Sequence, residues 1–148
     1  MNFDLSAVTH STEQTEELGK AVATVMLDDP SLPRFVALFG DLGVGKTAFV
    51  RGFTQAIAPS ARVKSPTFAL VNEYIGGRLS VYHFDMFRIN SWDDLYSSGW
   101  FDYIEQGGVM VAEWSENIEE ALPDDAITIE ISRIDDEKRE ILVRKAGN

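Results

Sequence analysis

The sequence contains no cysteine among its 148 residues. Disulfide bonds, thiolate metal sites and cysteine nucleophiles are therefore excluded. It also contains no run of 18 apolar residues, so no transmembrane helix is expected. The segment Met1–Leu5 has neither the basic residues nor the apolar block of a secretory signal. We expect a cytoplasmic protein that does not engage a membrane.

Positive charge is scarce and unevenly placed. The chain has 13 Lys and Arg against 24 Asp and Glu, a net charge of −11, and it has no Lys or Arg between Ile89 and Ser132. Such a chain gains little from the phosphate backbone of a nucleic acid, so direct binding of nucleic acid is disfavoured. We interpret most of the acids as a solvated face. The alternative is that the acidic segment holds a cation or docks a basic partner.

Hydrophobic patterning predicts alternating strands and helices. A short strand is predicted around Leu5, an amphipathic helix at Thr12–Met26 after the capping pair Ser11 and Gln14, and a fully buried strand at Arg34–Phe39. The elements predicted downstream are a helix at Lys46–Ala58, strands at Thr67–Tyr74, Leu79–Phe84 and Val109–Ala112, a short helical or looped segment at Ser91–Tyr103, and hairpin strands at Ala126–Ile131 and Glu140–Val143.

One motif carries chemistry. Gly40–Thr47 reads Gly-Asp-Leu-Gly-Val-Gly-Lys-Thr and matches the phosphate-binding loop G-x-x-x-x-G-K-[ST] at every fixed position. Glycines in such a loop let backbone N–H groups form a nest for phosphates at the positive end of the helix that follows. Lys46 is expected to reach the β- and γ-phosphates, and the Thr47 hydroxyl to bind Mg²⁺.

The motif and the order of elements together predict the fold class. We expect an α/β, P-loop NTPase-like mixed β-sheet flanked by helices, with a C-terminal antiparallel β-hairpin. The 45% hydrophobic and 25% charged residues are typical of globular proteins, and the length fits a single P-loop domain over residues 1–148.

A phosphate loop needs a further acid for its metal ion or for the attacking water. Asp85 ends the predicted strand Leu79–Phe84, and Glu113 ends the strand Val109–Ala112. The carboxyl ends of neighbouring parallel strands meet at one edge of a sheet, so both acids are expected beside the phosphates. The spacing leaves open which acid binds Mg²⁺ and which positions water.

Other residues carry weaker signals. Lys64–Thr67 is a basic, hydroxyl-bearing turn that either contacts phosphate and moves with nucleotide state or is a plain loop. Trp114 is expected near the nucleotide, and Trp92 and Trp100 in the core or facing a partner. His83 lies inside an apolar strand, which favours a hydrogen-bonded core histidine over a ligand.

Several linked motifs resemble one known family. The segment Phe39–Phe49 resembles the phosphate loop of the bacterial TsaE family, and Ala48 departs from a Thr that is common there. The switch-like segment and the two acidic motifs of that family are similar to Lys64–Phe68 with Leu70–Tyr74, to Tyr82–Arg88 and to Glu113–Trp114. Ser115 is a second departure, because Pro or Ala frequently follows the Trp.

The resemblance implies an Mg²⁺-dependent ATPase required for forming threonylcarbamoyladenosine next to the anticodon of tRNA. It implies that the protein acts with the TsaB–TsaD heterodimer, resets that complex by hydrolysing ATP, and meets tRNA only indirectly. Thr47 and Glu113 would hold Mg²⁺, and the catalytic residues would be Lys46, Asp85 and Glu113. The ATP-binding residues would be Thr12, Leu42, Gly43, Val44, Gly45, Lys46, Thr47 and Glu116.

Two other functions stay open. A small-metabolite P-loop kinase fits the size and the loop, although no base follows Arg88 until Arg133 to form a lid over the phosphates. A kinase would release one ADP for each phosphorylated acceptor. A non-hydrolysing nucleotide sensor would release no phosphate. A GTPase is disfavoured because the sequence has no Asn-Lys-x-Asp element.

Overall fold

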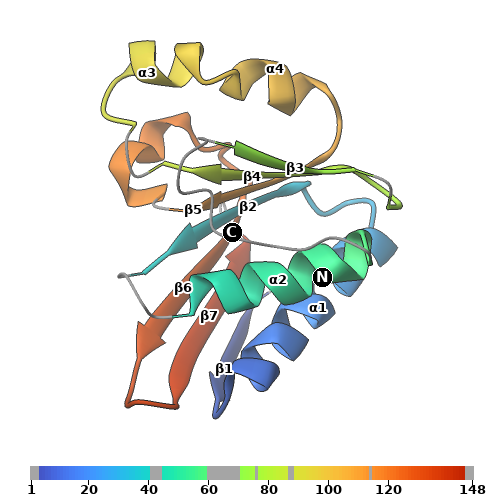
Figure 1. Ribbon diagram of the computed structural model, residues 1–148, viewed down its shortest axis with the longest axis vertical. Coiled ribbons are helices and arrows are strands. Elements are labelled where there is room, and N and C mark those ends of the chain that lie inside the picture. Colours follow the sequence, from blue (N-terminus) through green and yellow to red (C-terminus); the bar gives the residue numbers. More distant parts are fainter. Residues whose placement is uncertain are drawn as a thin grey trace.

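A seven-stranded β-sheet forms the centre of the molecule (Figure 1). The computed structural model describes residues 4–40, 45–59, 71–75, 77–86, 89–113 and 115–145, with backbone alone at 116–118. The strand order is β1-β7-β6-β2-β5-β4-β3. The strands are β1 Leu5–Thr9, β2 Phe35–Phe39, β3 Val71–Tyr74, β4 Val81–Asp85, β5 Val109–Glu113, β6 Ile127–Arg133 and β7 Arg139–Lys145.

The inner strands run parallel and the outer strands antiparallel. Parallel pairing joins β6 to β2, β2 to β5 and β5 to β4. Antiparallel pairing adds β3 at one edge and β7 with β1 at the other. The sheet contains both kinds of pairing, so the predicted mixed sheet is confirmed. The predicted C-terminal antiparallel β-hairpin is also confirmed, because β6 pairs with β7.

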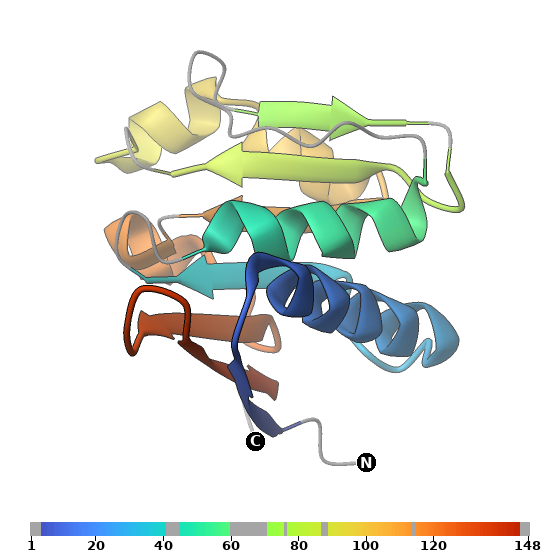
Figure 2. The ribbon, with the colours of Figure 1, turned by 60° about the horizontal axis from the view of Figure 1, so that its bottom comes forward.

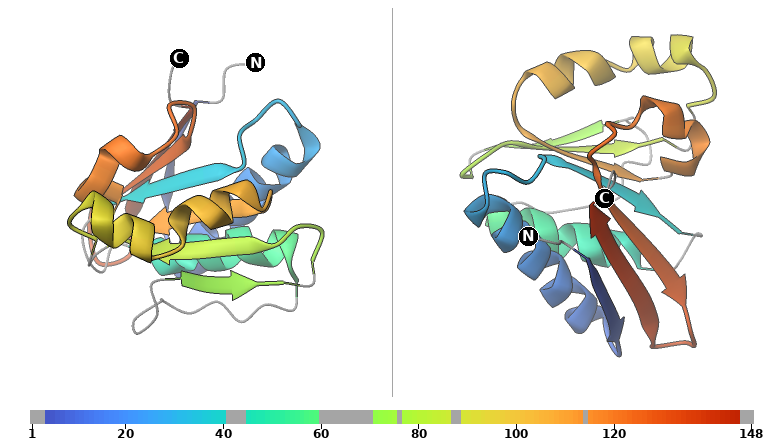
Figure 3. Two further views of the ribbon diagram at one scale, coloured as in Figure 1. Left: turned by 90° about the horizontal axis from the view of Figure 1, so that it is seen from above. Right: turned by 180° about the vertical axis from the view of Figure 1, so that it is seen from behind.

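Helices cover both faces of the sheet (Figures 2 and 3). The helices α1 (Thr12–Asp28) and α2 (Lys46–Ile57) lie side by side on one face. The short helices α3 (Trp92–Ser97) and α4 (Trp100–Glu105) cover the other face, and the 3₁₀ helix η1 (Ser115–Ala121) follows β5. Within the described ranges, no helix is long and apolar enough to cross a lipid bilayer.

The start of α1 is fixed by a reciprocal cap. The Gln14 backbone N–H donates to Ser11 Oγ at 3.1 Å, and the His10 N–H donates to Gln14 Oε1 at 2.7 Å. These two bonds satisfy amide groups that have no partner inside the helix. The cap therefore sets where the chain turns from β1 into α1, as the spacing of Ser11 and Gln14 predicts.

Alternation along the strands divides the core in two. In β2, Val36 and Leu38 pack under α1 and α2, whereas Phe35 and Ala37 pack on the side of α3 and α4. All four side chains are at least 95% buried. A strand that is apolar on both faces must lie inside the sheet, which explains the continuous run of apolar residues.

Two glycines allow α1 and α2 to touch along their backbones. A Cβ added to Gly52 of α2 would lie 1.8 Å from the Glu16 carbonyl oxygen of α1. A Cβ added to Gly19 of α1 would lie 2.2 Å from the Phe49 carbonyl oxygen of α2. Both distances are far below van der Waals contact, so the helix pair depends on glycine at these positions.

The structure refines two of the expected elements and adds one that was not expected. The segment Ser91–Tyr103 is helical, as two short helices that place Trp100 fully in the core and leave Trp92 46% exposed. Residues 67–70 of the strand predicted at Thr67–Tyr74 lie outside the described residues, and 71–74 form β3. The 3₁₀ helix η1 has no apolar periodicity that predicts it.

We expect Gly52→Ala to destabilise the protein, although alanine is the better helix former by about 1 kcal/mol. The added methyl group must push α1 away from α2, a cost of about 1–3 kcal/mol or more. Urea unfolding followed by circular dichroism measures the change, and Lys20→Ala on the exposed face of α1 is the control. A more stable Gly52→Ala variant would contradict this account of the helix contact.

Candidate functional site

Three parallel strands bring the predicted acids to one edge of the sheet. Asp85 at the end of β4 lies directly opposite Glu113 at the end of β5. On the same two strands, Tyr82, Phe84 and Ala112 face α4. Because side chains alternate along a strand, both acids lie on the opposite face, which α2 covers. Since β2 is the other neighbour of β5, its carboxyl end and Gly40, the first residue of the motif, lie at the same edge. The structure thus brings the two acids and the motif together.

The described part of the motif presents a lysine at the start of α2. Gly45 precedes the helix with a φ of 104°, a conformation that strains residues with a Cβ. Lys46 is only 5% exposed, and its Nζ donates to the Gly40 carbonyl oxygen at 2.7 Å. Thr47 lies half-buried in the first turn. The ammonium group is thereby tied to Gly40, directly after the end of β2.

Glu113 is buried and paired with a histidine. Glu113 is 5% exposed, and its Oε2 contacts Nε2 of His83, which is fully buried two residues before Asp85. An ionised Glu113 accepts this hydrogen bond from Nε2–H. The His83 Nδ1 atom has no hydrogen-bond partner among the described residues. His83 is therefore a hydrogen-bonded core histidine, as expected, but its partner is the acid predicted to bind Mg²⁺.

The donor set fits Mg²⁺ only together with a nucleotide. Among the described residues, no group of three or more His, Cys, Asp or Glu side chains is arranged to hold a metal ion. Magnesium commonly takes only one or two protein oxygens and completes its shell with phosphates and water. The Thr47 hydroxyl and the Glu113 carboxylate are hard oxygen donors of this kind. Asp85 is half-buried at the same edge.

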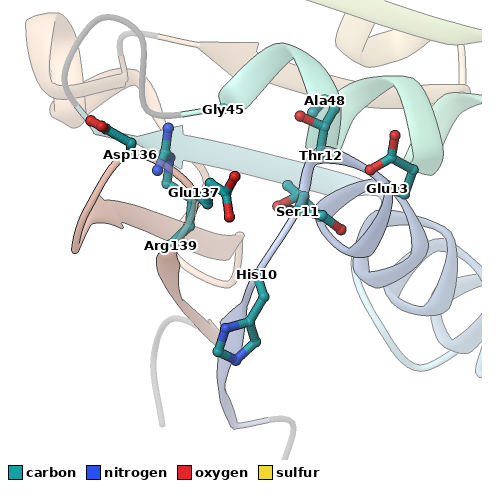
Figure 4. Close-up of a pocket in the computed structure, with 10 residues that line it drawn as sticks. His10, Ser11, Thr12, Glu13, Gly45, Ala48, Asp136, Glu137 and Arg139 are labelled. Atoms are coloured by element: carbon teal, nitrogen blue, oxygen red, sulfur yellow. Dashed lines mark hydrogen bonds between the residues drawn. The ribbon is translucent and has the colours of Figure 1, made fainter.

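A cavity of about 340 Å³ lies beside the start of α2 (Figure 4). Its walls come from the start of α1, from the first turn of α2 and from the turn between β6 and β7. The lining residues are His10, Ser11, Thr12, Glu13, Thr15, Gly45, Ala48, Asp136, Glu137 and Arg139. Arg139 extends from the hairpin toward Gly45, whereas the ring of His10 points away from Gly45 (Figure 4). The cavity therefore lies next to Gly45 and the first turn of α2.

The hairpin turn fixes Arg139. Asp135 accepts hydrogen bonds from the backbone N–H groups of Lys138 and Glu137, and these bonds lower the pKa of its carboxyl group. The lowered pKa means that the ionised form stabilises the turn above the ordinary carboxyl range and that this contribution is lost as the pH falls. The Arg139 Nη1 atom donates to the carbonyl oxygens of Asp135 at 2.8 Å and Lys138 at 3.0 Å.

Some predicted site residues cannot be placed. Leu42, Gly43, Val44, Trp114 and the turn Lys64–Thr67 lie outside the described residues, and of Glu116 the backbone alone is described. Thr12 lines the cavity next to Gly45. Sequence reasoning missed Arg139 and the turn before it, because nothing in a hairpin's pattern indicates that its turn reaches a loop almost a hundred residues earlier.

The comparisons with known proteins point in one direction. A family model described as "Threonylcarbamoyl adenosine biosynthesis protein TsaE" matches residues 9–141. The tRNA threonylcarbamoyladenosine biosynthesis protein TsaE of Bacillus subtilis is 36% identical over 140 residues, which cover 95% of this chain and 85% of that protein. Its namesake from Haemophilus influenzae is 40% identical over 113 residues, which cover 76% of this chain and 71% of that protein.

A solved structure agrees with these relatives. The crystal structure of Bacillus subtilis YdiB superposes with a TM-score of 0.73 at 33% sequence identity, covering 100% of this chain and 89% of that chain. The likeness extends over the whole sheet, including the C-terminal hairpin, where the sequence motifs are sparse.

We expect His83→Leu to lower the free energy of unfolding by about 3–5 kcal/mol, because it leaves the buried Glu113 carboxylate without its partner. The double variant His83→Leu/Glu113→Leu should recover most of that loss, since it removes both polar groups. A double-mutant cycle by urea unfolding measures the coupling. Purely additive losses would mean that the two side chains do not depend on each other.

Proposed function

The chain belongs to the TsaE family, and from this premise we propose that it binds and hydrolyses ATP with Mg²⁺ in support of threonylcarbamoyladenosine formation next to the anticodon of tRNA. The observation that carries the proposal is the position of Lys46. Its ammonium group donates a hydrogen bond to the Gly40 carbonyl oxygen, at the sheet edge where β4 ends at Asp85 and β5 ends at Glu113. We further propose that residues 1–148 act as a single P-loop ATPase domain.

The roles at the phosphates follow from the placement of the side chains. Lys46 would bind the β- and γ-phosphates through its three N–H donors, and the backbone from Leu42 to Thr47 would cradle them. When bound, Mg²⁺ would offset the charge of the phosphates. Thr47 would hold it with its hydroxyl oxygen from α2, and Glu113 with a carboxylate oxygen from β5. Asp85, which is more open to water, would position the attacking water.

The cavity beside Gly45 is suited to the nucleoside part of ATP. It opens onto the first turn of α2, so a ligand whose phosphates lie on the motif can extend into it. Its volume of about 340 Å³ lies at the lower end of the range for small-molecule sites. Thr12 offers a hydroxyl at one wall, and the Arg139 guanidinium offers a flat cationic face at the other. Glu116 would contribute from η1.

The proposal includes protein partners. The sequence has no Lys or Arg between Arg88 and Arg133, where a small kinase would carry the basic lid that neutralises a transferring phosphate, so a partner would have to complete the site for fast turnover. We propose the TsaB–TsaD heterodimer as that partner, with tRNA met only indirectly. Since tRNA is modified where it is made and used, we place this work in the cytoplasm.

We expect Lys46→Ala to weaken ATP binding by about 10- to 100-fold, the equivalent of losing one hydrogen bond to a charged group. Isothermal titration calorimetry measures the affinity, and Lys20→Ala is the matched control because its ammonium group is exposed on α1. Unchanged ATP binding together with unchanged tRNA modification in Lys46→Ala would refute the proposed function.

Substitutions of Glu113 and Asp85 should have different effects on nucleotide binding and hydrolysis. We expect Glu113→Gln to remove the gain in nucleotide affinity that Mg²⁺ gives over EDTA. Asp85→Asn should keep that gain and lose about 10²- to 10⁴-fold in phosphate release, the usual range for a group that directs proton transfer. Titrations with and without Mg²⁺ and single-turnover assays separate these effects. If Asp85→Asn loses the Mg²⁺ dependence instead, the two roles are reversed.

A further inference from the structure

The outer side of α3 and α4 carries a group of exposed apolar side chains. The described part of the chain exposes eight large hydrophobic side chains, and four of them lie on these two short helices. We call these four the aromatic face: Trp92, Tyr96, Phe101 and Ile104, which are 46%, 65%, 36% and 38% exposed. Exposed apolar groups that gather in this way commonly mark a binding surface.

The four side chains form one continuous surface. Trp92 and Tyr96 are four residues apart on α3, and Phe101 and Ile104 are three apart on α4, so each pair shares one side of its helix. The rings of Tyr96 and Phe101 join the two pairs, with centroids 4.8 Å apart. The contact spans the turn between the helices.

The core does not need the aromatic face. Trp100 fills the space beneath the two helices, with its ring 5.5 Å from that of Phe35 and 5.2 Å from that of Phe84. Leu95 is also fully buried. Since these inner residues already anchor α3 and α4 to the sheet, the outer residues hold their places at a cost in exposed apolar area that folding does not explain.

The helices of the aromatic face also carry exposed acids. Asp93, Asp102 and Glu105 are exposed on the same two helices, and the segment from Ile89 to Ser132 has no Lys or Arg. Exposed aromatic side chains with acids beside them have the composition of an interface core with a charged rim, although Arg34 lines the same hollow as Ile104. The complementary surface must be apolar at its centre and basic at its edge.

We propose that the aromatic face is a docking surface for a protein partner that presents an apolar patch bordered by Lys and Arg. A second copy of this chain would bring its own acids against these acids. A nucleic acid or an anionic membrane would be repelled by the same charges. The surface lies on the side of the sheet opposite α2 (Figure 3).

This inference rests on the proposed function, since the partner to be tested is the TsaB–TsaD heterodimer. The experiment is calorimetric titration of that purified complex with the full-length chain and ATP. Tyr96→Ser and Phe101→Ser should each weaken binding by about tenfold or more, as for aromatic residues at the centre of an interface. The control Leu5→Ser changes a side chain that is 46% exposed on β1, at the far edge of the sheet, and should leave binding unchanged.

Charge reversal tests the basic rim separately. Asp102→Lys should weaken binding and make it less sensitive to salt, whereas Asp28→Lys at the end of α1 should do neither. All these positions are exposed, so circular dichroism should show that every variant is folded. Nucleotide affinity without the partner should stay at the wild-type value in each of them.

Each result decides the question. Wild-type binding that Tyr96→Ser and Phe101→Ser leave unchanged overturns the docking surface and leaves the proposed function standing. No binding by the wild-type chain removes the proposed partner and this inference with it, while the nucleotide titrations still test ATP binding. Self-association of the chain that Phe101→Ser abolishes would assign the aromatic face to a second copy and also overturn the proposal.

Discussion

The site depends on the parallel pairing of β2, β5 and β4 in one register. Parallel strands end at the same edge, so the register that sets Asp85 opposite Glu113 also sets both beside the loop that leaves β2. A shift of one residue in β5 would turn Glu113 to the other face and exchange its apolar neighbours between the two cores. The alternating burial of Val109, Met110 and Val111 between the two cores prevents that shift. The packing of the strands thus fixes where Asp85 and Glu113 lie.

The buried pair of His83 and Glu113 adds a second constraint to this edge. A carboxylate that is 5% exposed needs a hydrogen-bond donor, and the fully buried imidazole supplies it from the neighbouring strand. The pair holds the Glu113 carboxylate on the side of α2. In the proposed function, the histidine is a positioning residue that acts through the acid, whereas Lys46 and Thr47 meet the nucleotide themselves.

Much of this arrangement could be predicted from the sequence, and the reasons are local. The run Arg34–Phe39, the capping pair at Ser11 and the glycine-rich motif each reflect interactions within a few residues. The pairing of His83 with Glu113 could not be predicted, because it depends on two strands 30 residues apart being neighbours in the sheet. Arg139 was missed for the same reason. Its place in the cavity is set by the hairpin turn and by the sheet that carries it.

The cavity joins parts of the chain that are made at very different times. Its walls include residues of the segments His10–Thr15 and Asp136–Arg139. The first segment follows β1 and the second leads into β7, and these two strands pair at one edge of the sheet. A ribosome must therefore have released residues up to about Lys145 before this wall can close. Contacts of such long sequence separation slow folding. During synthesis, the start of α1 and the first turn of α2 emerge well before the hairpin, so a nascent chain passes through a stage in which it has only part of the cavity's wall.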